Sequence, residues 1–190
     1  DSFPYMIDEK IKVGVALADF NSNQKDDIVF GTDSDNLYLL LDNASVAEGF
    51  PFIAEDKIQS SPSILDVLND KRIFFGSRDD KMYSIDASGN QVFSFETDGN
   101  IFSSPTFSKD AFGQIAVFFG SSDGNVYALN LDGDLIDGWP VSIGNEVVGS
   151  VLFEDINGDS ELEVISFSNS AVHLNSLDGN SFGLGSIASD

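Results

Sequence analysis

One unit of about 45 residues recurs four times along this 190-residue chain, and no other feature of the sequence constrains the fold as strongly. The units begin at Ile11, Ile58, Ile101 and Val147. Each unit reads as four short β-prone segments separated by turns. Units of this length with four strands each are typical of β-propeller blades. The sequence therefore predicts an all-β fold built from four 4-stranded antiparallel blades.

Fixed positions inside the unit support this interpretation. The first segment of every unit carries a small residue at the same place, namely Gly14, Ser61, Ser104 and Ser150. The inner strands of a propeller converge on the central channel, so we expect bulky side chains to be excluded there. Glycines end three of the apolar second segments, at Gly31, Gly76 and Gly120. Three more, Gly89, Gly133 and Gly179, fall in matching turns where a positive φ is predicted.

The repeat also predicts the boundaries of the blades. A single propeller region covers residues 1–190, with blade 1 at 11–57, blade 2 at 58–100, blade 3 at 101–146 and blade 4 at 147–190. Residues 1–10 are predicted to be the outer strand of a preceding blade, because Phe3-Pro4 matches Phe50-Pro51. The favoured hypothesis is therefore an arc of a propeller with about seven or eight blades. The alternative is a four-bladed ring in which the N-terminal strand completes blade 4.

Composition excludes several classes of function. The chain has 32 Asp and Glu against 9 Lys and Arg, for a net charge of −23. Such a charge argues against binding to nucleic acid, and equally against binding to an anionic membrane surface. It suits a soluble secreted protein or one that holds cations. No apolar stretch approaches the length of a membrane span, so we expect no membrane insertion. The chain has no cysteine, which permits an extracellular, cell-surface or periplasmic location without requiring one.

Two families of propeller repeat share residues with these units. Ser60-Ser61-Pro62 and Ser103-Ser104-Pro105, followed by a Phe-Gly-Ser segment and then by Met82-Tyr83 or Val126-Tyr127, resemble quinoprotein-like (PQQ-like) repeats. The first and fourth units instead resemble FG-GAP/VCBS repeats, which in integrin α-chains and bacterial secreted proteins carry calcium between the first and second strands. The resemblance implies a propeller fold, with calcium as the expected cofactor.

The loop over residues 155–163 is the strongest candidate for a metal site. Side chains with oxygen stand at its positions 1, 3, 5 and 9, namely Asp155, Asn157, Asp159 and Glu163, while Glu161 at position 7 would give its backbone carbonyl. Calcium takes six to eight oxygen ligands, and alternate residues of a tight loop can direct side chains at one centre. The loop also resembles the calcium loop of FG-GAP repeats. We therefore predict a calcium ion here.

The loop over residues 19–27 has the same spacing, and we predict a second, weaker calcium site there. Its side-chain ligands would be Asp19, Asn21, Asn23 and Asp27, with the Lys25 carbonyl at position 7 and the Lys25 ammonium turned to solvent. Two carboxylates in place of three make this site the weaker one. The equivalent segments of the second and third units, 66–70 and 109–113, do not keep the spacing, so no ion is predicted in either.

Two single residues are assigned to packing. His173 is the only histidine, and it stands in the place of Tyr38, Tyr83 and Tyr127. The only tryptophan, Trp139, matches Phe50 in the outer strand, and the alternative for it is a platform on which a carbohydrate stacks. With the histidine assigned in this way, no Ser/His/Asp catalytic set is readable from the sequence.

Three hypotheses for function follow. The favoured one is a non-enzymatic scaffold, with calcium stiffening its loops and one face binding a protein or a glycan in adhesion. The second is the propeller of an enzyme, either a quinone-dependent dehydrogenase or a polysaccharide-active hydrolase or lyase. Quinone enzymes of this resemblance usually have several tryptophans, and this chain has one. The third is a structural component of a cell-surface assembly, with further blades supplied by the same or another chain.

Overall fold

The computed structural model of the chain describes residues 3–67, 70–110, 112–169 and 171–181, and within these ranges it contains strands and no helix. The strands form one antiparallel sheet for each repeat. Blade 1 contains β1 (Ala16–Ala18), β2 (Asp27–Gly31), β3 (Asn36–Leu40) and β4 (Phe52–Ile53). Blade 2 contains β5 (Ser63–Val67), β6 (Asp70–Gly76), β7 (Lys81–Asp86) and β8 (Gln91–Glu96). Blade 3 contains β9 (Thr106–Lys109), β10 (Ile115–Gly120), β11 (Asn125–Leu129) and β12 (Val141–Ser142).

Blade 4 contains β13 (Leu152–Glu154), β14 (Glu163–Ser168) and β15 (Ala171–Ser176). The predicted all-β fold of antiparallel blades is confirmed. The segment predicted as the outer strand of blade 4 lies outside the described residues beyond Ser181. Ser181 itself bridges to Asn175, as Val46 bridges to Leu40 and Leu135 to Leu129 in blades 1 and 3.

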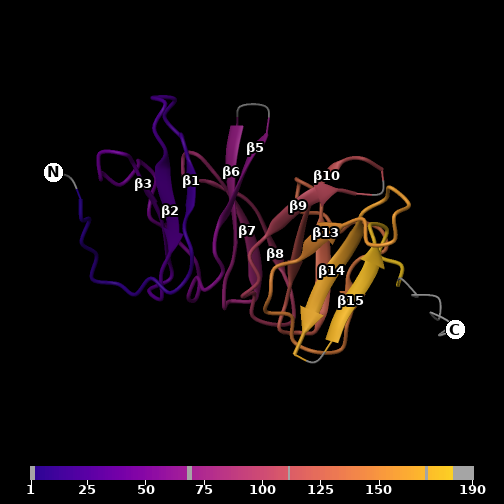
Figure 1. Cartoon of the computed structure of the whole chain (residues 1–190). Helices are drawn as coiled ribbons and strands as arrows, with labels where there is room; N and C mark the ends of the chain where they lie inside the picture. The colour runs from indigo at the N-terminus through magenta and orange to yellow at the C-terminus, as the bar shows by residue number, and fades with distance from the viewer. Residues whose placement is uncertain (1–2, 68–69, 111, 170, 182–190) are drawn as a thin grey trace, which may run out of the picture.

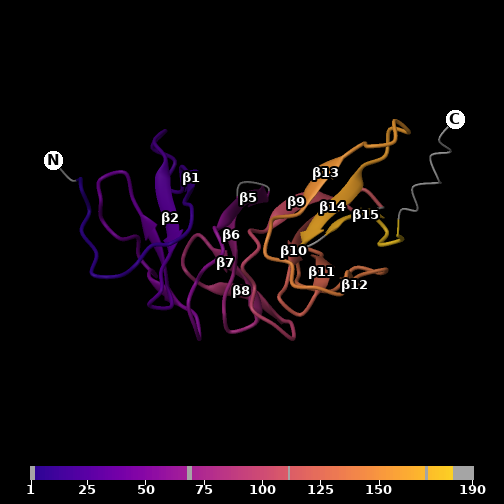
Figure 2. The ribbon, with the colours of Figure 1, turned by 60° about the horizontal axis from the view of Figure 1, so that its bottom comes forward.

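The four sheets stand side by side in an arc (Figure 1), and a second view shows the same succession (Figure 2). Blade 1 and blade 4 lie at opposite ends of this arc, so the alternative of a closed four-bladed ring is wrong. Residues 3–10 run along the side of blade 1 that faces away from blade 2, and no strand is assigned among them. A strand needs partners, and those predicted for this segment are not among the four described sheets. The assignment of residues 1–10 to a preceding blade therefore stays a prediction.

The hydrophobic core lies between the blades. Val29 and Leu37 of blade 1 pack against Ile58, Ile73 and Phe75 of blade 2, and equivalent clusters join blade 2 to blade 3 and blade 3 to blade 4. Stacked Phe–Tyr pairs on β2–β3, β6–β7 and β10–β11 have ring centroids 5.1–5.2 Å apart. The two rings of each pair lie on neighbouring strands of one sheet. Together they bury a large apolar area.

Glycine at the end of the second strand has a role that the sequence does not reveal. A Cβ atom added to Gly31 would lie 2.2 Å from a methyl carbon of Ile58, and Gly76 and Gly120 meet Ile101 and Val147 at the same distance. Each of these branched residues is the first residue of the following blade. Its backbone N–H donates to the carbonyl of the residue after the glycine, in the preceding blade, at 3.0–3.1 Å. We call this pairing of a branched side chain with a glycine the interblade notch.

The turn and packing predictions also hold. Gly89, Gly133 and Gly179 have φ between +80° and +90°, and Ala44 adopts +65° where the first repeat lacks a glycine. Trp139 is only 5% exposed. Its ring meets Phe118 edge-on, and its indole N–H donates to the Leu177 carbonyl of blade 4 at 3.1 Å. Trp139 is therefore a packing residue, which removes the alternative of a carbohydrate platform.

Candidate functional site

The loop between β13 and β14 is held closed by its own side chains. The Asp155 carboxylate at position 1 accepts the N–H groups of Gly158, Asp159 and Ser160 at 2.6–3.1 Å. The side chain of Asn157 at position 3 accepts the Asp159 N–H at 2.7 Å, and the side chain of Asp159 at position 5 accepts the Glu161 N–H at 2.8 Å. These bonds wind the backbone around the side chains at positions 1, 3 and 5.

Position 9 closes the same loop from the second strand. Glu163, the first residue of β14, is 2% exposed, and its carboxylate accepts the Ile156 N–H at 2.7 Å. The Asn157 side-chain NH₂ lies 2.9 Å from an oxygen of Asp159 and 2.9 Å from an oxygen of Glu163. Oxygen atoms from positions 5 and 9 therefore converge on one point, which a single positive group can reach.

The loop between β1 and β2 has the same arrangement. Asp19 at position 1 accepts from Asn23 and Gln24 at 3.1 and 2.7 Å. The side chain of Asn21 at position 3 accepts the Asn23 N–H at 3.1 Å, and the side chain of Asn23 at position 5 accepts the Lys25 N–H at 2.9 Å. Asp27 at position 9 accepts the Phe20 N–H at 2.9 Å and is fully buried. Side chains at positions 1, 3, 5 and 9 thus bond to equivalent N–H groups in both loops.

Backbone dihedral angles confirm that the two loops share one conformation. Positions 4 and 6 have positive φ in both, at Ser22 (60°) and Gln24 (67°) in the first loop and at Gly158 (81°) and Ser160 (72°) in the second. Only one of these four residues is glycine, and positive φ is unfavourable for the others. The side-chain hydrogen bonds within each loop therefore hold a backbone that local propensity alone does not favour.

Asp42, which lies outside the predicted loop, also bonds to residues of the first loop. The Lys25 ammonium lies 2.8 Å from the Asp42 carboxylate, which also accepts from the Asn23 side chain at 2.9 Å. Hydrogen bonding to Asp42 raises the pKa of Lys25, and the same bond lowers the pKa of Asp42. The positive charge is thus held by Asp42 and not by the predicted ligands. Asp42 stands where Ala87, Leu131 and Leu177 stand in the other repeats, and that substitution was its only sequence signal.

Hydrogen bonding favours the charged form of the position 1 carboxylate in the first loop. Desolvation acts to raise the pKa of Asp19, but hydrogen bonds from the backbone N–H groups of residues 21–24 together outweigh it and lower that pKa below its ordinary value. An acceptor-only carboxylate at the start of the loop is the form that a hard cation requires.

Blades 2 and 3 lack this arrangement, as the sequence predicts. Position 9 is occupied by Arg72 in blade 2 and by Ala116 in blade 3, according to the strand register. The Arg72 guanidinium donates to the Leu131 carbonyl of the next blade at 2.8 Å. Asp110 closes a shorter turn by accepting from Phe112 and Gln114, at 2.9 and 2.7 Å.

The predicted ligands are not gathered into a ready-made carboxylate cluster. Within the described ranges, no three side chains of the types His, Cys, Asp and Glu lie close enough together to hold a metal ion. A calcium site here would depend on asparagine and backbone carbonyl oxygens as well as carboxylates, and calcium accepts all three. Both predicted calcium sites therefore remain predictions.

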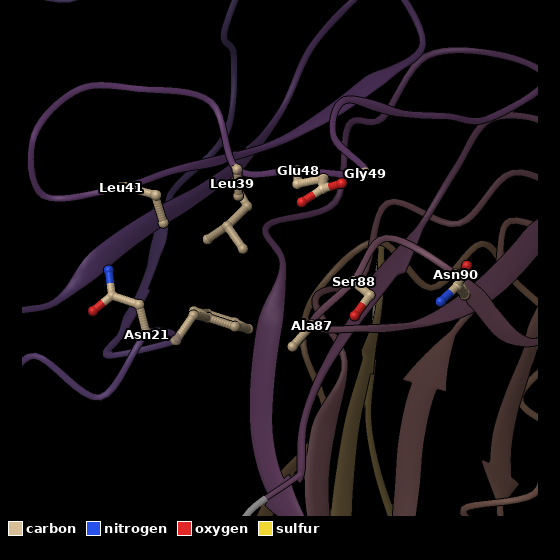
Figure 3. Close-up of a pocket in the computed structure, with 10 residues that line it drawn as sticks. Asn21, Leu39, Leu41, Glu48, Gly49, Ala87, Ser88 and Asn90 are labelled. Atoms are coloured by element: carbon tan, nitrogen blue, oxygen red, sulfur yellow. The ribbon is translucent and has the colours of Figure 1, made fainter.

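A cleft of about 720 Å³ lies between blades 1 and 2, beside the first loop. Leu39, Leu41 and Asn21 line the blade 1 side, and Ala87 and its neighbours line the blade 2 side (Figure 3). Phe20 and Ala47 add apolar surface. Ser88, Asn90 and Glu48 supply polar groups around it, and all three are exposed.

Ala87 explains why the cleft exists at this interface. The first residue of the turn after the third strand is Ala87 in blade 2, but Leu131 in blade 3 and Leu177 in blade 4. Both leucines pack against the core between their blade and the preceding one. The shorter side chain at position 87 leaves the corresponding space between blades 1 and 2 open.

His173 occupies the register of the tyrosines, as predicted. It pairs with Ser166 where Tyr83 pairs with Phe75, and its Nε2 lies 3.1 Å from the Ser168 hydroxyl. Among the described residues, no carboxylate bonds to His173.

Antiparallel sheets, four-stranded in blades 1, 2 and 3 and joined by equivalent interfaces, define a β-propeller fold. Comparison with solved structures agrees. BamB from Moraxella catarrhalis matches with a TM-score of 0.66 at 16% identity, over 92% of this chain and 53% of that one. BBS1N, solved in complex with ARL6DN, matches with a TM-score of 0.61 at 15% identity, over 88% of this chain and 52% of that one.

A europium-containing methanol dehydrogenase also matches, with a TM-score of 0.58 at 15% identity, over 82% of this chain and 39% of that one. The chain thus spans about half of the first two of these structures and less of the third. No family model and no curated protein sequence matches the chain. At these identities the likeness shows the fold alone. Within the described ranges, no helix is present that could cross a membrane.

Proposed function

We propose that this protein is a non-enzymatic, calcium-binding β-propeller scaffold that binds a protein partner in an extracellular or periplasmic compartment. The observation that carries the proposal is the matched hydrogen bonding of the two loops over residues 19–27 and 155–163. Two separate segments hold oxygen-bearing side chains at the same four positions and adopt the same backbone conformation. The two intervening blades have neither the four side chains nor this conformation.

Calcium would be held in the second loop by Asp155, Asn157, Asp159 and Glu163 with the Glu161 carbonyl, and in the first by Asp19, Asn21, Asn23 and Asp27 with the Lys25 carbonyl. When bound, the ion supplies positive charge that offsets repulsion among these carboxylates. Sites on extracellular modules often have dissociation constants of about 10⁻⁴ to 10⁻³ M, which calcium fills outside the cell more readily than inside. The acidic surface, with a net charge of −23, is consistent with such a setting.

The experiment is a calcium titration of thermal stability on three variants. A ligand that binds only the folded state at tenfold saturation adds about 1.4 kcal/mol per site. We expect calcium to raise the melting temperature of the wild type, Asp155→Ala to remove more of that rise than Asp19→Ala, and magnesium to substitute poorly because it requires a tighter octahedron.

Asp110→Ala is the matched control, because Asp110 also closes a turn by accepting backbone N–H groups but belongs to a loop without the spacing. It should lower the melting temperature and leave the calcium-induced rise intact. A wild type whose melting temperature is the same in excess chelator and in millimolar calcium would contradict both sites.

Protein binding is assigned to the cleft beside Ala87. Its wall is apolar at Phe20, Leu39 and Leu41, and its rim carries the exposed carboxylate of Glu48, which has no ion-pair partner within the described ranges. Such a site fits an apolar side chain flanked by a basic residue, because the anchor fills the cleft and the charge faces an acidic surface. The BBS1 structure shows that a propeller of this fold is found in complex with a protein.

A peptide library displayed on phage tests this assignment. We expect selection in calcium to enrich peptides with an apolar residue next to Lys or Arg, and those peptides to bind Ala87→Leu at least about tenfold more weakly, which is 1.4 kcal/mol. Leucine is the residue that blades 3 and 4 carry at this position, so the variant is expected to fold. Enriched peptides that bind Ala87→Leu as tightly as the wild type would place the partner elsewhere.

A further inference from the structure

The side of blade 1 that faces away from blade 2 exposes residues whose equivalents are packed in every other blade. Ile11, Val15 and Leu17 are 45%, 51% and 57% exposed. By strand register and the interblade hydrogen bonds, their equivalents are Ile58, Pro62 and Ile64 in blade 2, Ile101, Pro105 and Phe107 in blade 3, and Val147, Val151 and Phe153 in blade 4. All nine are buried or packed against the core shared with the preceding blade. Blade 1 thus presents the surface that blades 2, 3 and 4 use to join the blade before them.

The three observed joints define what would cover this surface. In each, a branched side chain enters a notch at a glycine, and its N–H donates to the next carbonyl at 3.0–3.1 Å. Ile11 is the branched residue of blade 1, and none of the described residues offers its N–H such a carbonyl. The partner must therefore be a sheet whose second strand ends in glycine.

A second copy of this chain does not meet that requirement. The position equivalent to Gly31, Gly76 and Gly120 in blade 4 is Phe167, which pairs with Val172 as Gly120 pairs with Val126. Even one added Cβ atom at the glycines would lie 2.2 Å from the entering methyl group. A phenylalanine side chain fills the notch, so the two ends of the arc are not complementary and do not join head to tail.

Residues 3–10 run along the open side of blade 1, and the Lys10 carbonyl accepts the Asp33 N–H at 2.9 Å, as the Lys57 carbonyl accepts the Arg78 N–H of blade 2 at 3.0 Å. Phe52 of blade 1 packs on the stacked pair Phe75 and Tyr83 of blade 2, and Phe95 packs on the equivalent pair of blade 3. By sequence Tyr5 matches Phe52. Glu9 accepts from the Tyr38 hydroxyl at 2.8 Å.

From these contacts we infer that blade 1 packs against a further blade which precedes it in the polypeptide, with a glycine-ended second strand and with residues 3–10 as its outer strand. Every joint in the structure links consecutive repeats, and in blades 1, 2 and 3 the outer strand is the next strand in the chain after the third strand. Those two regularities make the same polypeptide, and not a separate chain, the source of the missing strands. This inference does not depend on calcium binding, so the two proposals fail separately.

The test adds such a blade to the full chain. Residues 101–136 hold the first three strands of blade 3 with its glycine, and we would place a copy of them directly before Asp1. The grafted strands and residues 3–10 should then form a complete blade. We expect amide hydrogen exchange across residues 11–17 to slow by at least about tenfold and the melting temperature to rise.

The control is the same fusion with the grafted copy of Gly120 changed to leucine, which fills the notch and leaves the rest of the graft unchanged. It should return exchange at residues 11–17 to the rate of the original chain. Equal protection in the two fusions, or none in either, would overturn the inference. So would a dimer of the original chain in sedimentation that Ile11→Asp dissociates, because a second copy would then cover the surface.

Discussion

Blades 1 and 4 differ from blades 2 and 3 in the loop between the first two strands, whereas the three joints between the blades are built alike. Position 9 of that loop is a buried carboxylate in blades 1 and 4 but Arg72 or Ala116 in the other two. The notch, by contrast, recurs with a 2.2 Å approach at all three joints. The repeat thus separates positions that build the arc from positions that vary between blades.

Blade 4 differs from blades 1, 2 and 3 in a second respect. The stacked Phe–Tyr pair is replaced by Ser166 and His173, and the glycine of the notch by Phe167. Both replacements lie on β14 and β15, at the end of the arc. Blade 4 therefore lacks, on these two strands, the residues that blades 1, 2 and 3 use at their joints.

Filling a notch between two blades should produce the largest effect on stability. In Gly76→Ala the new Cβ would lie 2.2 Å from a methyl carbon of Ile101 and 2.8 Å from its carbonyl oxygen, and both sides are buried. We expect a loss of about 3 kcal/mol in urea unfolding, because overpacking in a rigid core forces the backbone apart. Gly149→Ala is the control, since nothing lies within 4 Å of its added Cβ. Similar losses in both variants would show that the notch is not specific.

Alkaline pH should distinguish blade 1 from blades 2 and 3. The tyrosines of blades 2 and 3 donate to an aspartate of their own hairpin, at 2.7 and 2.6 Å, whereas Tyr38 donates to Glu9. Burial, followed by the hydrogen bond to Glu9 and its charge, raises the pKa of Tyr38 to about 12. A raised pKa stabilises the fold below the unfolded value of about 10, and this contribution is lost as the pH rises through about 12.

The ultraviolet absorbance of tyrosinate, followed together with urea unfolding at increasing pH, measures this effect. Tyr38→Phe should remove part of the loss of stability between about pH 10 and 12. The pKa values of Tyr83 and Tyr127 are raised further by burial and by Asp79 and Asp123, so neither tyrosine should ionise in this window while the protein is folded. Ionisation of all three tyrosines together would contradict the distinction.

The smallest effect should come from making blade 2 resemble blade 3 at one buried position. Ser84 pairs with Phe74 where Ala128 pairs with Phe118, and its hydroxyl is fully buried without a hydrogen-bond partner. Ser84→Ala removes an unsatisfied group, so we expect a gain of about 0.5–1 kcal/mol in the free energy of unfolding. Ser63→Ala is the control that should lose stability, because the Ser63 hydroxyl donates to the Pro105 carbonyl at 2.7 Å. A loss in Ser84→Ala would indicate that its hydroxyl has an unseen partner.

The fold could be predicted because the same pattern of small residues, apolar segments and glycines occurs in four units. Small residues at Gly14 and Ser61 predicted converging inner strands, and the Ser61 hydroxyl indeed accepts the Gly14 N–H at 2.9 Å. The matching spacing of the two loops could be found in the sequence because it is local, and calcium binding at either loop stays a prediction. The roles of Asp42 and Ala87 could not be found there, because they depend on which residues from another loop or blade come within reach. The role of glycine in the notch was not predicted for the same reason, since it depends on an isoleucine or valine that lies 25–27 residues later.

The buried indole of Trp139 gives the molecule an internal reporter. It is the only tryptophan in the chain, and it belongs to blade 3 while its N–H donates to a carbonyl of blade 4. Tryptophan emission therefore originates at a single joint and is blind to the other two. If blade 4 separates while blades 1–3 stay folded, the emission spectrum shifts to the red before the circular dichroism of the sheets is lost. If the arc unfolds as one unit, the two signals change together.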